Sequence, residues 1–207
     1  MEKPYHRFVF DIKNRKFIGK FEKMYQNEEK ENYDSWNQLK IDNEKKFTIS
    51  FIKKKNFKKI IDFGCGKGLV AKKIKNNKNF IVGLDISKTA IEKAKNNNKK
   101  KVRFIAIKKN QLIENVLKIN KNKYDLIICN EVLSYLKNWK KYIKNFSSVA
   151  ANLYIALFIP NNPIGYVKNL DQLKKELSKH YSIKDLKFKK LKNMHIFYCT
   201  PKLRITN

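Results

Sequence analysis

The chain has 207 residues, 42% of them hydrophobic, so it fits one globular domain with an extension and is long enough to bury a substantial core. Its 48 Lys and Arg residues against 18 Asp and Glu give a net charge of +30, and only four of the basic residues are arginine. Nucleic-acid readers depend on the planar fork of arginine, so this composition weakens a nucleic-acid function, whereas an anionic small molecule would still be attracted.

The first 44 residues are rich in aromatic side chains and differ from the rest of the chain. Phe17, Phe21 and the pair Met24-Tyr25 recur at helical spacing, which predicts one helix across residues 13–26. A second helix is expected over residues 45–54.

Three glycines at alternate positions follow the first predicted strand. The strand covers residues 59–63, the glycines are Gly64, Gly66 and Gly68, and a helical pattern over about 67–76 comes next. Glycine has no Cβ and tolerates positive φ, so the backbone of such a turn can approach a ligand closely. The alternative is a glycine-rich turn between a strand and a helix that binds nothing.

An acid closes the second predicted strand. Residues 80–84 are apolar and Asp85 comes next, where a carboxylate can accept hydrogen bonds from both hydroxyls of a ribose. Together with the glycines, this arrangement is typical of a parallel α/β domain that holds an adenosine-containing cofactor. Dinucleotide folds use G-x-G-x-x-G, but here the third glycine comes one residue early and Leu69 stands at the dinucleotide position, which disfavours a dehydrogenase.

Helices and strands continue to alternate along the rest of the chain. The expected elements are a helix over 88–97 capped by Ser87, a strand over 102–107, a weaker helix over 111–118, a strand over 124–130, a helix over 138–146, a strand over 152–159, a helix over 170–179, and strands over 182–189 and 194–199. Alternation predicts a parallel sheet with right-handed crossovers, and the last two strands pair as a hairpin because no helix separates them. We therefore expect an α/β, Rossmann-like fold with a mostly parallel seven-stranded sheet, a C-terminal antiparallel hairpin and helices on both faces.

Four of these positions resemble a known motif. Asp62, Gly64, Gly66 and Gly68 are similar to the acid-x-Gly-x-Gly-x-Gly motif of class I methyltransferases that use S-adenosylmethionine. The ribose-binding acid of that family matches Asp85, and its fourth motif matches the strand that starts at Tyr124-Asp125 and ends at Asn130. The resemblance covers roughly residues 45–200 and implies S-adenosylmethionine as the cofactor.

The resemblance also implies which residues surround the cofactor. The backbone around Gly64 and Asn130 would hold its methionine part, Ile86 would pack on the adenine, and Tyr25 or Trp36 would cover the methionine end. The full expected set is Asp62, Gly64, Cys65, Gly66, Gly68, Asp85, Ile86, Asn130, Tyr25 and Trp36. The chain departs from the family where many members place an adenine-binding acid after the third strand, since residues 106–110 read Ala-Ile-Lys-Lys-Asn.

The N-terminal segment, residues 1–44, is expected to be a helical cap over the cofactor site of a methyltransferase domain spanning 45–207. A helix packed on the sheet is the alternative interpretation. Methyl transfer from a sulfonium needs no metal, although a neutral hydroxyl acceptor would benefit from a general base. The catalytic candidates are His195 and His6, each with a structural role as the alternative, and the candidates for binding the acceptor are Arg7, Asp34, Glu131 and Tyr135; Asp34 and Glu131 could also serve as bases.

Three further segments narrow the range of molecules that could accept the methyl group. Residues 6–11, 34–38 and 162–168 resemble small methyltransferases from surface-polysaccharide clusters, including nodulation-type enzymes and enzymes linked to capsule phosphoramidate groups. This implies O-methylation of a sugar, a sugar nucleotide or a phosphoramidate. An RNA methyltransferase and a non-catalytic partner subunit are the alternatives; the Asn/Asp-Pro-Pro-aromatic signature of many RNA base methyltransferases is absent, because Asn130 is followed by Glu-Val-Leu.

The three cysteines Cys65, Cys129 and Cys199 lie far apart and form no C-x-x-C, so neither zinc nor a disulfide framework is expected. The first seven residues lack the apolar core of a signal peptide, and the longest apolar run, 153–159, is too short to span a bilayer. These features predict a cytoplasmic protein without a metal or a membrane span.

Overall fold

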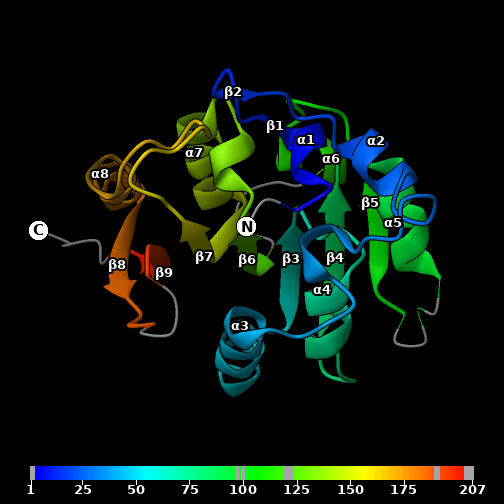
Figure 1. The fold of residues 1–207 in the computed structure, drawn as a ribbon. Helices are drawn as coiled ribbons and strands as arrows, with labels where there is room; N and C mark the ends of the chain where they lie inside the picture. The colour runs from blue at the N-terminus through cyan, green and yellow to red at the C-terminus, as the bar shows by residue number, and fades with distance from the viewer. Residues whose placement is uncertain (1–2, 97, 99–100, 119–123, 189–191, 203–207) are drawn as a thin grey trace, which may run out of the picture. The chain divides into compact units, whose positions relative to one another are not determined.

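A computed structural model of the chain describes residues 3–96, 98, 101–118, 124–188 and 192–202. The chain divides into two compact units, the first made of Met1–Lys58 and Asp62–Lys109 and the second of Lys59–Ile61 and Asn110–Asn207, so the division falls within strand β3 (Lys59–Phe63). Seven strands form one sheet in the order β5-β4-β3-β6-β7-β9-β8, which is the fold class that the alternating pattern predicts (Figure 1).

The first unit contains the N-terminal elements and the glycine turn. Besides the end of β3, its elements are α1 (His6–Val9), β1 (Phe10–Asp11), β2 (Lys16–Phe17), α2 (Phe21–Gln26), the 3-10 helix η1 (Ser35–Asn37), α3 (Asn43–Lys54), α4 (Leu69–Ile74), β4 (Phe80–Asp85), α5 (Lys88–Lys95) and β5 (Arg103–Ala106). Strands β4 and β5 pair in parallel, with Asp85 opposite Ala106, and α2 packs against α5 (Figure 1).

Capping side chains stand at the start of two helices of the first unit, α3 and α5. The carboxylate of Asp42 accepts a hydrogen bond from the Lys45 N–H (2.9 Å) at the start of α3. The Ser87 hydroxyl accepts one from the Ala90 N–H (3.0 Å) at the start of α5, which confirms the predicted cap. Both caps satisfy N–H groups that the helix itself leaves without a partner.

The predicted helix across residues 13–26 is wrong in its first half. Residues 10–17 form an antiparallel hairpin with Phe10 opposite Phe17, and only Phe21–Gln26 is helical. The Asp11 carboxylate accepts a hydrogen bond from the Asn14 N–H (2.9 Å), which stabilises a turn instead of a helix. The Phe17 ring contacts Phe10 across the hairpin and Phe21 at the start of α2, with centroids 6.1 and 6.2 Å apart.

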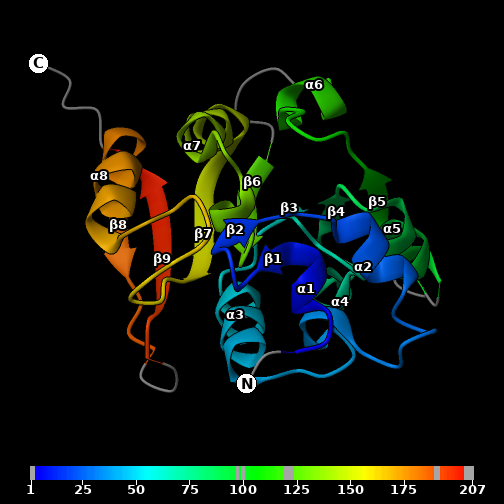
Figure 2. The same ribbon diagram turned by 45° about the horizontal axis from the view of Figure 1, so that its top comes forward.

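The second unit contains the C-terminal strands and helices of the chain, together with the start of β3. Its elements, after the start of β3, are α6 (Ile113–Leu117), β6 (Tyr124–Asn130), the 3-10 helix η2 (Leu133–Tyr135), α7 (Trp139–Val149), β7 (Ala150–Phe158), α8 (Leu170–His180), β8 (Tyr181–Asp185) and β9 (Met194–Pro201). Strands β6 and β7 pair in parallel, and β9 pairs antiparallel with both β7 and β8, which confirms the terminal hairpin. In Figure 2, α8 lies beside β8 and β9.

The remaining predicted elements match within a few residues. The strand expected over 182–189 ends at Asp185, and residue 189 lies outside the described part of the chain. No helix among the described residues is long and apolar enough to cross a bilayer. The described residues also contain no group of three or more His, Cys, Asp or Glu side chains that could hold a metal ion.

Candidate functional site

The glycine turn, residues 64–68, joins β3 to α4 and lies wholly in the first unit. All five of its backbone N–H groups donate hydrogen bonds within that unit: Gly64 and Cys65 to the Leu84 carbonyl (2.7 and 3.0 Å), Gly66 to Asp85 Oδ2 (2.8 Å), Lys67 to Gln38 Oε1 (2.5 Å) and Gly68 to the Cys65 carbonyl (2.9 Å). The turn is therefore held in shape by the end of β4, through Leu84 and Asp85, and by Gln38 of the N-terminal segment.

Asp85 ends β4, as the sequence predicts, and its carboxylate is 9% exposed. One oxygen accepts from the Gly66 N–H and the other from the Ser87 N–H (2.9 Å), so the acid ties the glycine turn to the start of α5. Burial raises the pKa of Asp85, and these backbone N–H groups partly offset the rise. Ile86, the next residue, is 41% exposed and available for contact with a ligand.

Asp62 is the acid that precedes the glycines, and only 4% of it is exposed. Burial raises its pKa from 3.8 to about 7; a hydrogen bond from the Ala71 N–H opposes the rise and the nearby Asp85 carboxylate adds to it. Its Oδ2 has no hydrogen-bond partner among the described residues. A buried acid whose pKa is raised in this way is a common feature of binding sites.

The Gln38 carboxamide lies directly over Gly66. A Cβ added to Gly66 would come within 2.6 Å of three Gln38 atoms and displace the carboxamide, and at a positive φ of 51° it would also strain the backbone. The Gln38 amide also donates to the Tyr25 hydroxyl (2.8 Å), and that ring is 3% exposed. Burial, followed by the charge of Asp85, raises the pKa of Tyr25 well above its usual value. Tyr25 therefore lies close enough to Asp85 to be affected by its charge.

A cluster of two lysines and two acids surrounds the glycine turn. The Lys67 ammonium pairs with Glu28 (3.0 Å) and Asp34 (2.6 Å), and Lys93 from α5 pairs with the other Glu28 oxygen (3.0 Å). The Glu28 side chain is 5% exposed and Lys67 is 11% exposed, so these pairs are shielded from solvent. Glu28 also accepts the Ser35 N–H (2.9 Å), which fixes the backbone beyond α2.

Glu22, on α2, sits at the first turn of α5. Its carboxylate accepts from the hydroxyls of Ser87 and Thr89, each at 2.7 Å. Burial raises its pKa, but these hydrogen bonds and others from the backbone outweigh burial, and the pKa is lowered overall. A carboxylate at a helix N-terminus is stabilised by the helix dipole.

Trp36 and His6, expected at the cofactor and at the reacting atoms respectively, form an aromatic cluster on the N-terminal segment. The Tyr5 ring contacts both, with centroids 4.9 Å from His6 and 5.2 Å from Trp36, and Tyr33 lies 5.8 Å from Tyr5. His6 Nδ1 accepts the Lys3 N–H (3.3 Å). The structure therefore brings these two residues together, packed against Tyr5.

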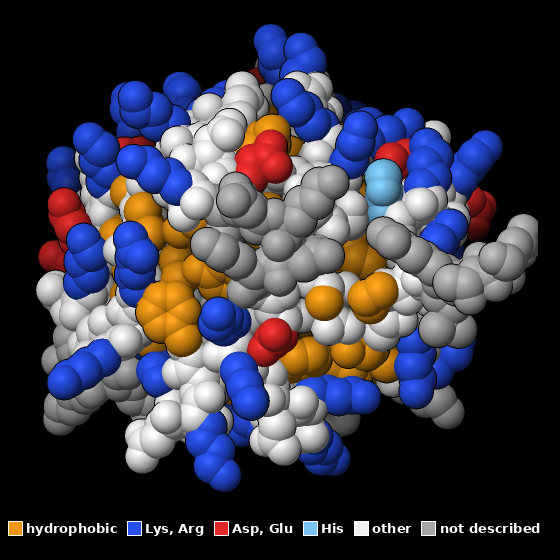
Figure 3. Space-filling model, turned by 180° about the vertical axis from the view of Figure 1, so that it is seen from behind, with side chains coloured by type: hydrophobic (Ala, Val, Ile, Leu, Met, Phe, Trp, Pro, Cys, Tyr) orange, Lys and Arg blue, Asp and Glu red, His pale blue; other side chains and the backbone are white. Residues whose placement is uncertain are grey.

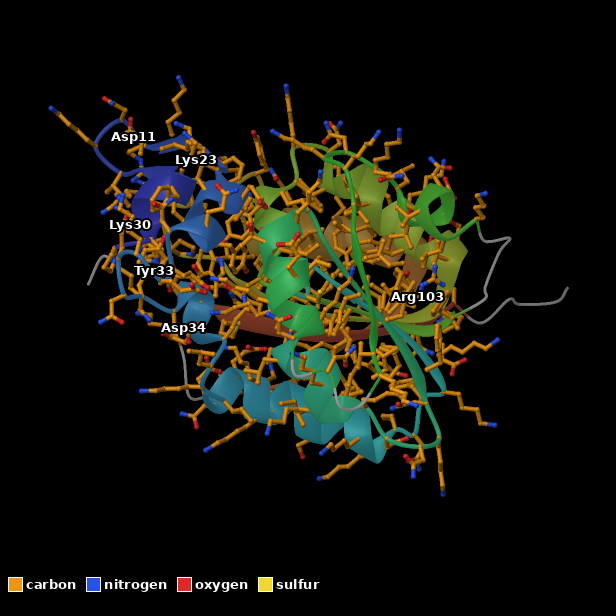
Figure 4. The ribbon with its side chains drawn as sticks, turned by 90° about the vertical axis from the view of Figure 1, so that its right-hand side faces the viewer. Asp11, Lys23, Lys30, Tyr33, Asp34 and Arg103 are labelled. Carbon is orange, nitrogen blue, oxygen red and sulfur yellow. The ribbon has the colours of Figure 1, made fainter. Side chains whose placement is uncertain are left out.

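Arg7 and Asp34, both expected at the acceptor, have protein partners in the structure. Arg7 forms an ion pair with Glu31 and is 56% exposed. Asp34 binds Lys67 and accepts the backbone N–H groups of Gln38 (3.0 Å) and Leu39 (2.7 Å). Figure 4 shows Tyr33 and Asp34 together on the N-terminal segment at the left of the view. Arg103, also in the first unit, is labelled at the right of the same view.

Asn130, Glu131, Tyr135 and His195 belong to the second unit. Asn130 ends β6, and Glu131 follows with a positive φ of 58°, a conformation that is uncommon outside glycine and is often found near functional sites. The Glu131 carboxylate accepts the Phe158 N–H (2.6 Å). Tyr135 closes η2, and His195 stands on β9 opposite Leu157, where burial lowers its pKa.

Sequence reasoning missed five residues of this site, namely Glu22, Glu28, Gln38, Lys67 and Lys93. Lys67 lies inside the glycine motif, so its position in the turn was a usable signal. Gln38 contacts a backbone N–H 29 residues away and has no motif around it. Gln38 and Glu28 come into contact with Lys67 only once the N-terminal segment has folded.

Comparison with known proteins identifies relatives of the chain. A family model described as "Methyltransferase domain" matches residues 54–197. The ubiquinone biosynthesis O-methyltransferase of Coxiella burnetii (strain RSA 493 / Nine Mile phase I) is 26% identical over 92 residues, which are 44% of this chain. The match covers 38% of that relative, so this chain aligns with well under half of the curated relatives' length.

Solved structures share the fold. The magnesium protoporphyrin IX methyltransferase from Synechocystis PCC 6803, crystallised with bound SAM (S-adenosylmethionine), superposes with a TM-score of 0.59 at 19% identity, covering 76% of this chain and 78% of that one. The N-terminal domain of EvdMO1 with bound SAH (S-adenosylhomocysteine) superposes with a TM-score of 0.64 at 11% identity, covering 78% and 83%. At these sequence identities, the similarity shows a shared fold and nothing more specific.

Proposed function

The chain belongs to the methyltransferase domain family and has the Rossmann-like fold of S-adenosylmethionine-dependent methyltransferases, and from this premise we propose that it methylates an oxygen atom of a small, anionic acceptor. The cofactor would supply an activated methyl group as a sulfonium. The protein then has to bind, orient and shield the reactants, which can lower the barrier by roughly 7–11 kcal/mol.

The hydrogen bonding of the glycine turn is the observation that carries the choice of cofactor. Its five N–H groups donate to protein acceptors, and four of these five hydrogen bonds end outside the N-terminal segment, so the turn has few donors to offer an anion. A pyrophosphate needs free N–H donors at such a turn. The ammonium and sulfonium groups of S-adenosylmethionine are cations and suit a turn of this kind.

The residues fit the cofactor in other respects. We assign its ribose to Asp85, its methionine part to the glycine turn and Asn130, its adenine to Ile86, and its cover to Tyr25 and Trp36. Asp62, Cys65, Gly64, Gly66 and Gly68 complete the proposed cofactor set. The low exposure of Asp85 supports its role, because a shielded carboxylate forms stronger hydrogen bonds with ribose hydroxyls than one in water.

The acceptor is proposed from two observations. Its anionic character is supported by the net charge of +30, which raises the local concentration of anions. Its oxygen chemistry is supported by the O-methyltransferase named among the relatives. Within that class, the resemblance of residues 6–11, 34–38 and 162–168 to polysaccharide-cluster enzymes favours a sugar, a sugar nucleotide or a phosphoramidate.

The acceptor residues remain part of this proposal. Arg7 would leave Glu31 to clamp an anion, and Glu131 and Tyr135 would line the acceptor side. His195 and His6 are the proposed bases for a neutral hydroxyl; a phosphate or carboxylate oxygen would need none. The lowered pKa of His195 favours the neutral imidazole that a general base requires.

An RNA acceptor would call for basic side chains gathered on one surface. On the face shown in Figure 3, Lys and Arg side chains are instead dispersed between apolar and polar ones. This distribution favours a small molecule over RNA.

The test is to incubate the purified chain with methyl-labelled S-adenosylmethionine and, separately, nucleotide sugars, phosphorylated sugars and RNA. Label in a nucleotide sugar or phosphorylated sugar supports the proposal. Label in RNA alone would replace it, and binding of S-adenosylhomocysteine without transfer to any acceptor would favour a non-catalytic partner subunit.

A further inference from the structure

The contact between the N-terminal segment and the glycine turn has a consequence beyond methyl transfer. Gln38 makes one hydrogen bond to each side of this contact: its Oε1 accepts the Lys67 N–H of the turn, and its amide donates to Tyr25 of the segment. The Gln38 carboxamide packs directly against Gly66, because a Cβ at that position would lie 2.2 Å from Gln38 Nε2. The second glycine of the motif therefore makes room for a residue of the chain itself.

Ion pairs also stabilise the contact between the N-terminal segment and the glycine turn. The Lys67 side chain forms ion pairs with both Glu28 and Asp34 of the N-terminal segment, and Lys93 of α5 pairs with the other oxygen of Glu28. Burial makes these pairs costly to separate, because opening one leaves a charge without its partner in a shielded place. Asp34 in turn fixes Gln38, whose backbone N–H it accepts.

We propose that Gln38 and Lys67 are positioning residues that latch residues 21–39 onto the glycine turn, and that this latch must open for the cofactor to enter or leave. The geometry supports gating because the Gln38 carboxamide covers Gly66 and is bonded to Tyr25, whose ring lies close enough to Asp85 to feel its charge. Both latch contacts end on the turn that binds the cofactor, so opening the latch and releasing the cofactor are coupled. The coupling rests on the proposed function, whereas the latch itself does not.

Hydrogen exchange of the full chain measures the latch directly. The reporters are the Ser35 N–H, bound to Glu28, and the Gln38 and Leu39 N–H groups, bound to Asp34. Gln38→Met removes both carboxamide hydrogen bonds at similar volume, and we expect exchange in peptides covering 28–39 to accelerate about tenfold. Lys67→Met should accelerate it by roughly ten- to a hundredfold, and Lys67→Arg should restore slow exchange because it keeps the charge.

Matched controls come from exposed residues of the same types. Gln172, on α8, and Lys73, on α4, are both exposed. Gln172→Met and Lys73→Met should leave exchange at 28–39 unchanged. Exchange at 28–39 that stays at the wild-type rate in both Gln38→Met and Lys67→Met would overturn the latch.

Stopped-flow release of S-adenosylhomocysteine tests the gate. We expect release to be about tenfold faster from Gln38→Met than from the wild type, in step with exchange. Faster exchange with an unchanged release rate would overturn the gating. If the wild-type chain binds no S-adenosylhomocysteine, the proposed function fails, and the exchange result alone still decides whether the latch exists.

Discussion

A single carboxylate, that of Asp85, connects three parts of the candidate site. It accepts hydrogen bonds from the glycine turn and from the start of α5, and Glu22 lies close enough to raise its pKa. Its role in holding the protein together is thus visible in the structure, and its role toward a ribose is proposed. Substitutions at this position have to separate the two roles.

Replacing Asp85 by Ala should weaken S-adenosylhomocysteine binding by about 1–3 kcal/mol, because the ribose hydroxyls lose a charged acceptor. Isothermal titration calorimetry measures the change. Asp85→Asn is the matched control, since it keeps one oxygen acceptor for the Gly66 N–H and loses the charge. Affinity that is the same in the wild type and in Asp85→Ala would remove this residue from the cofactor site.

The buried Asp62 predicts how stability depends on pH. Its pKa is about 7 when folded and 3.8 as a model value, so the folded chain binds more protons between these limits. Stability from this group is therefore fully present below about pH 4 and is lost as pH rises through 7. Thermal unfolding at pH 8 should show Asp62→Asn to be more stable than the wild type by about 1 kcal/mol or more.

The advantage of Asp62→Asn should disappear at pH 4, where the wild-type carboxyl is protonated. A difference from the wild type that is the same at pH 4 and pH 8 would show that the carboxylate is not shifted. Asp62→Asn isolates the effect of the charge, because the Asn side chain can still accept the hydrogen bond from the Ala71 N–H.

At the residue scale, the sequence predicted those parts of the site that lie in local patterns. Asp85 follows an apolar strand and Ser87 precedes a helix, and both stand where expected. Gln38 could not be predicted, because its position over Gly66 depends on a fold of the N-terminal segment that leaves no short-range signal. The same is true of Glu28, which meets two lysines from different elements.

At the scale of elements, side chains at both ends join α2 to α5: Glu22 bonds the start of α5, and Lys93 of α5 donates to the Tyr25 carbonyl (3.1 Å). The Glu22 carboxylate on α2 accepts hydrogen bonds from the hydroxyls of Ser87 and Thr89 at the start of α5. Changing Glu22 to Ala should therefore lower the free energy of unfolding by about 1–2 kcal/mol. Urea denaturation, followed by tryptophan fluorescence because Trp36 lies in the N-terminal segment, measures this change.

Glu29→Ala is the control for that substitution, because Glu29 is 87% exposed and its pair with Lys93 lies at the surface. We expect it to change stability by less than about 0.5 kcal/mol. Equal effects of the two substitutions would mean that Glu22 contributes no more than a surface charge.

The elements that the sequence predicted well are those with long, uniform patterns. Strand β6 was predicted at its observed bounds, because a run of buried apolar residues between polar turns has few other interpretations. The hairpin at 10–17 was missed because its strands have two residues each, too short for a period-two pattern. Phe17 and Phe21, four residues apart, satisfied the helical spacing by coincidence.

At the scale of the whole molecule, the net charge of +30 opposes the compact state. Salt screens repulsion between exposed charges over a Debye length of about 10 Å at 0.1 M, and it affects the shielded Lys67–Glu28 pair much less. Raising NaCl from 50 to 500 mM should therefore stabilise the chain by about 1 kcal/mol, or roughly 2–4 °C in Tm. Differential scanning calorimetry measures the shift.

Sodium sulfate at matched ionic strength should stabilise further, since excluded anions also strengthen apolar burial. A Tm that falls as NaCl rises would show that attractive surface pairs outweigh repulsion, and the lysine excess would then not be a destabilising feature.

The three cysteines of this chain are all buried, within the part of it that the structure describes. Burial raises the pKa of Cys65 and Cys199, so their thiolates are scarce at neutral pH and react slowly. Leu39, by contrast, is 77% exposed and directly follows Gln38. A maleimide dye would therefore label Leu39→Cys in preference to the native thiols, and its fluorescence could follow the opening of the segment in single molecules.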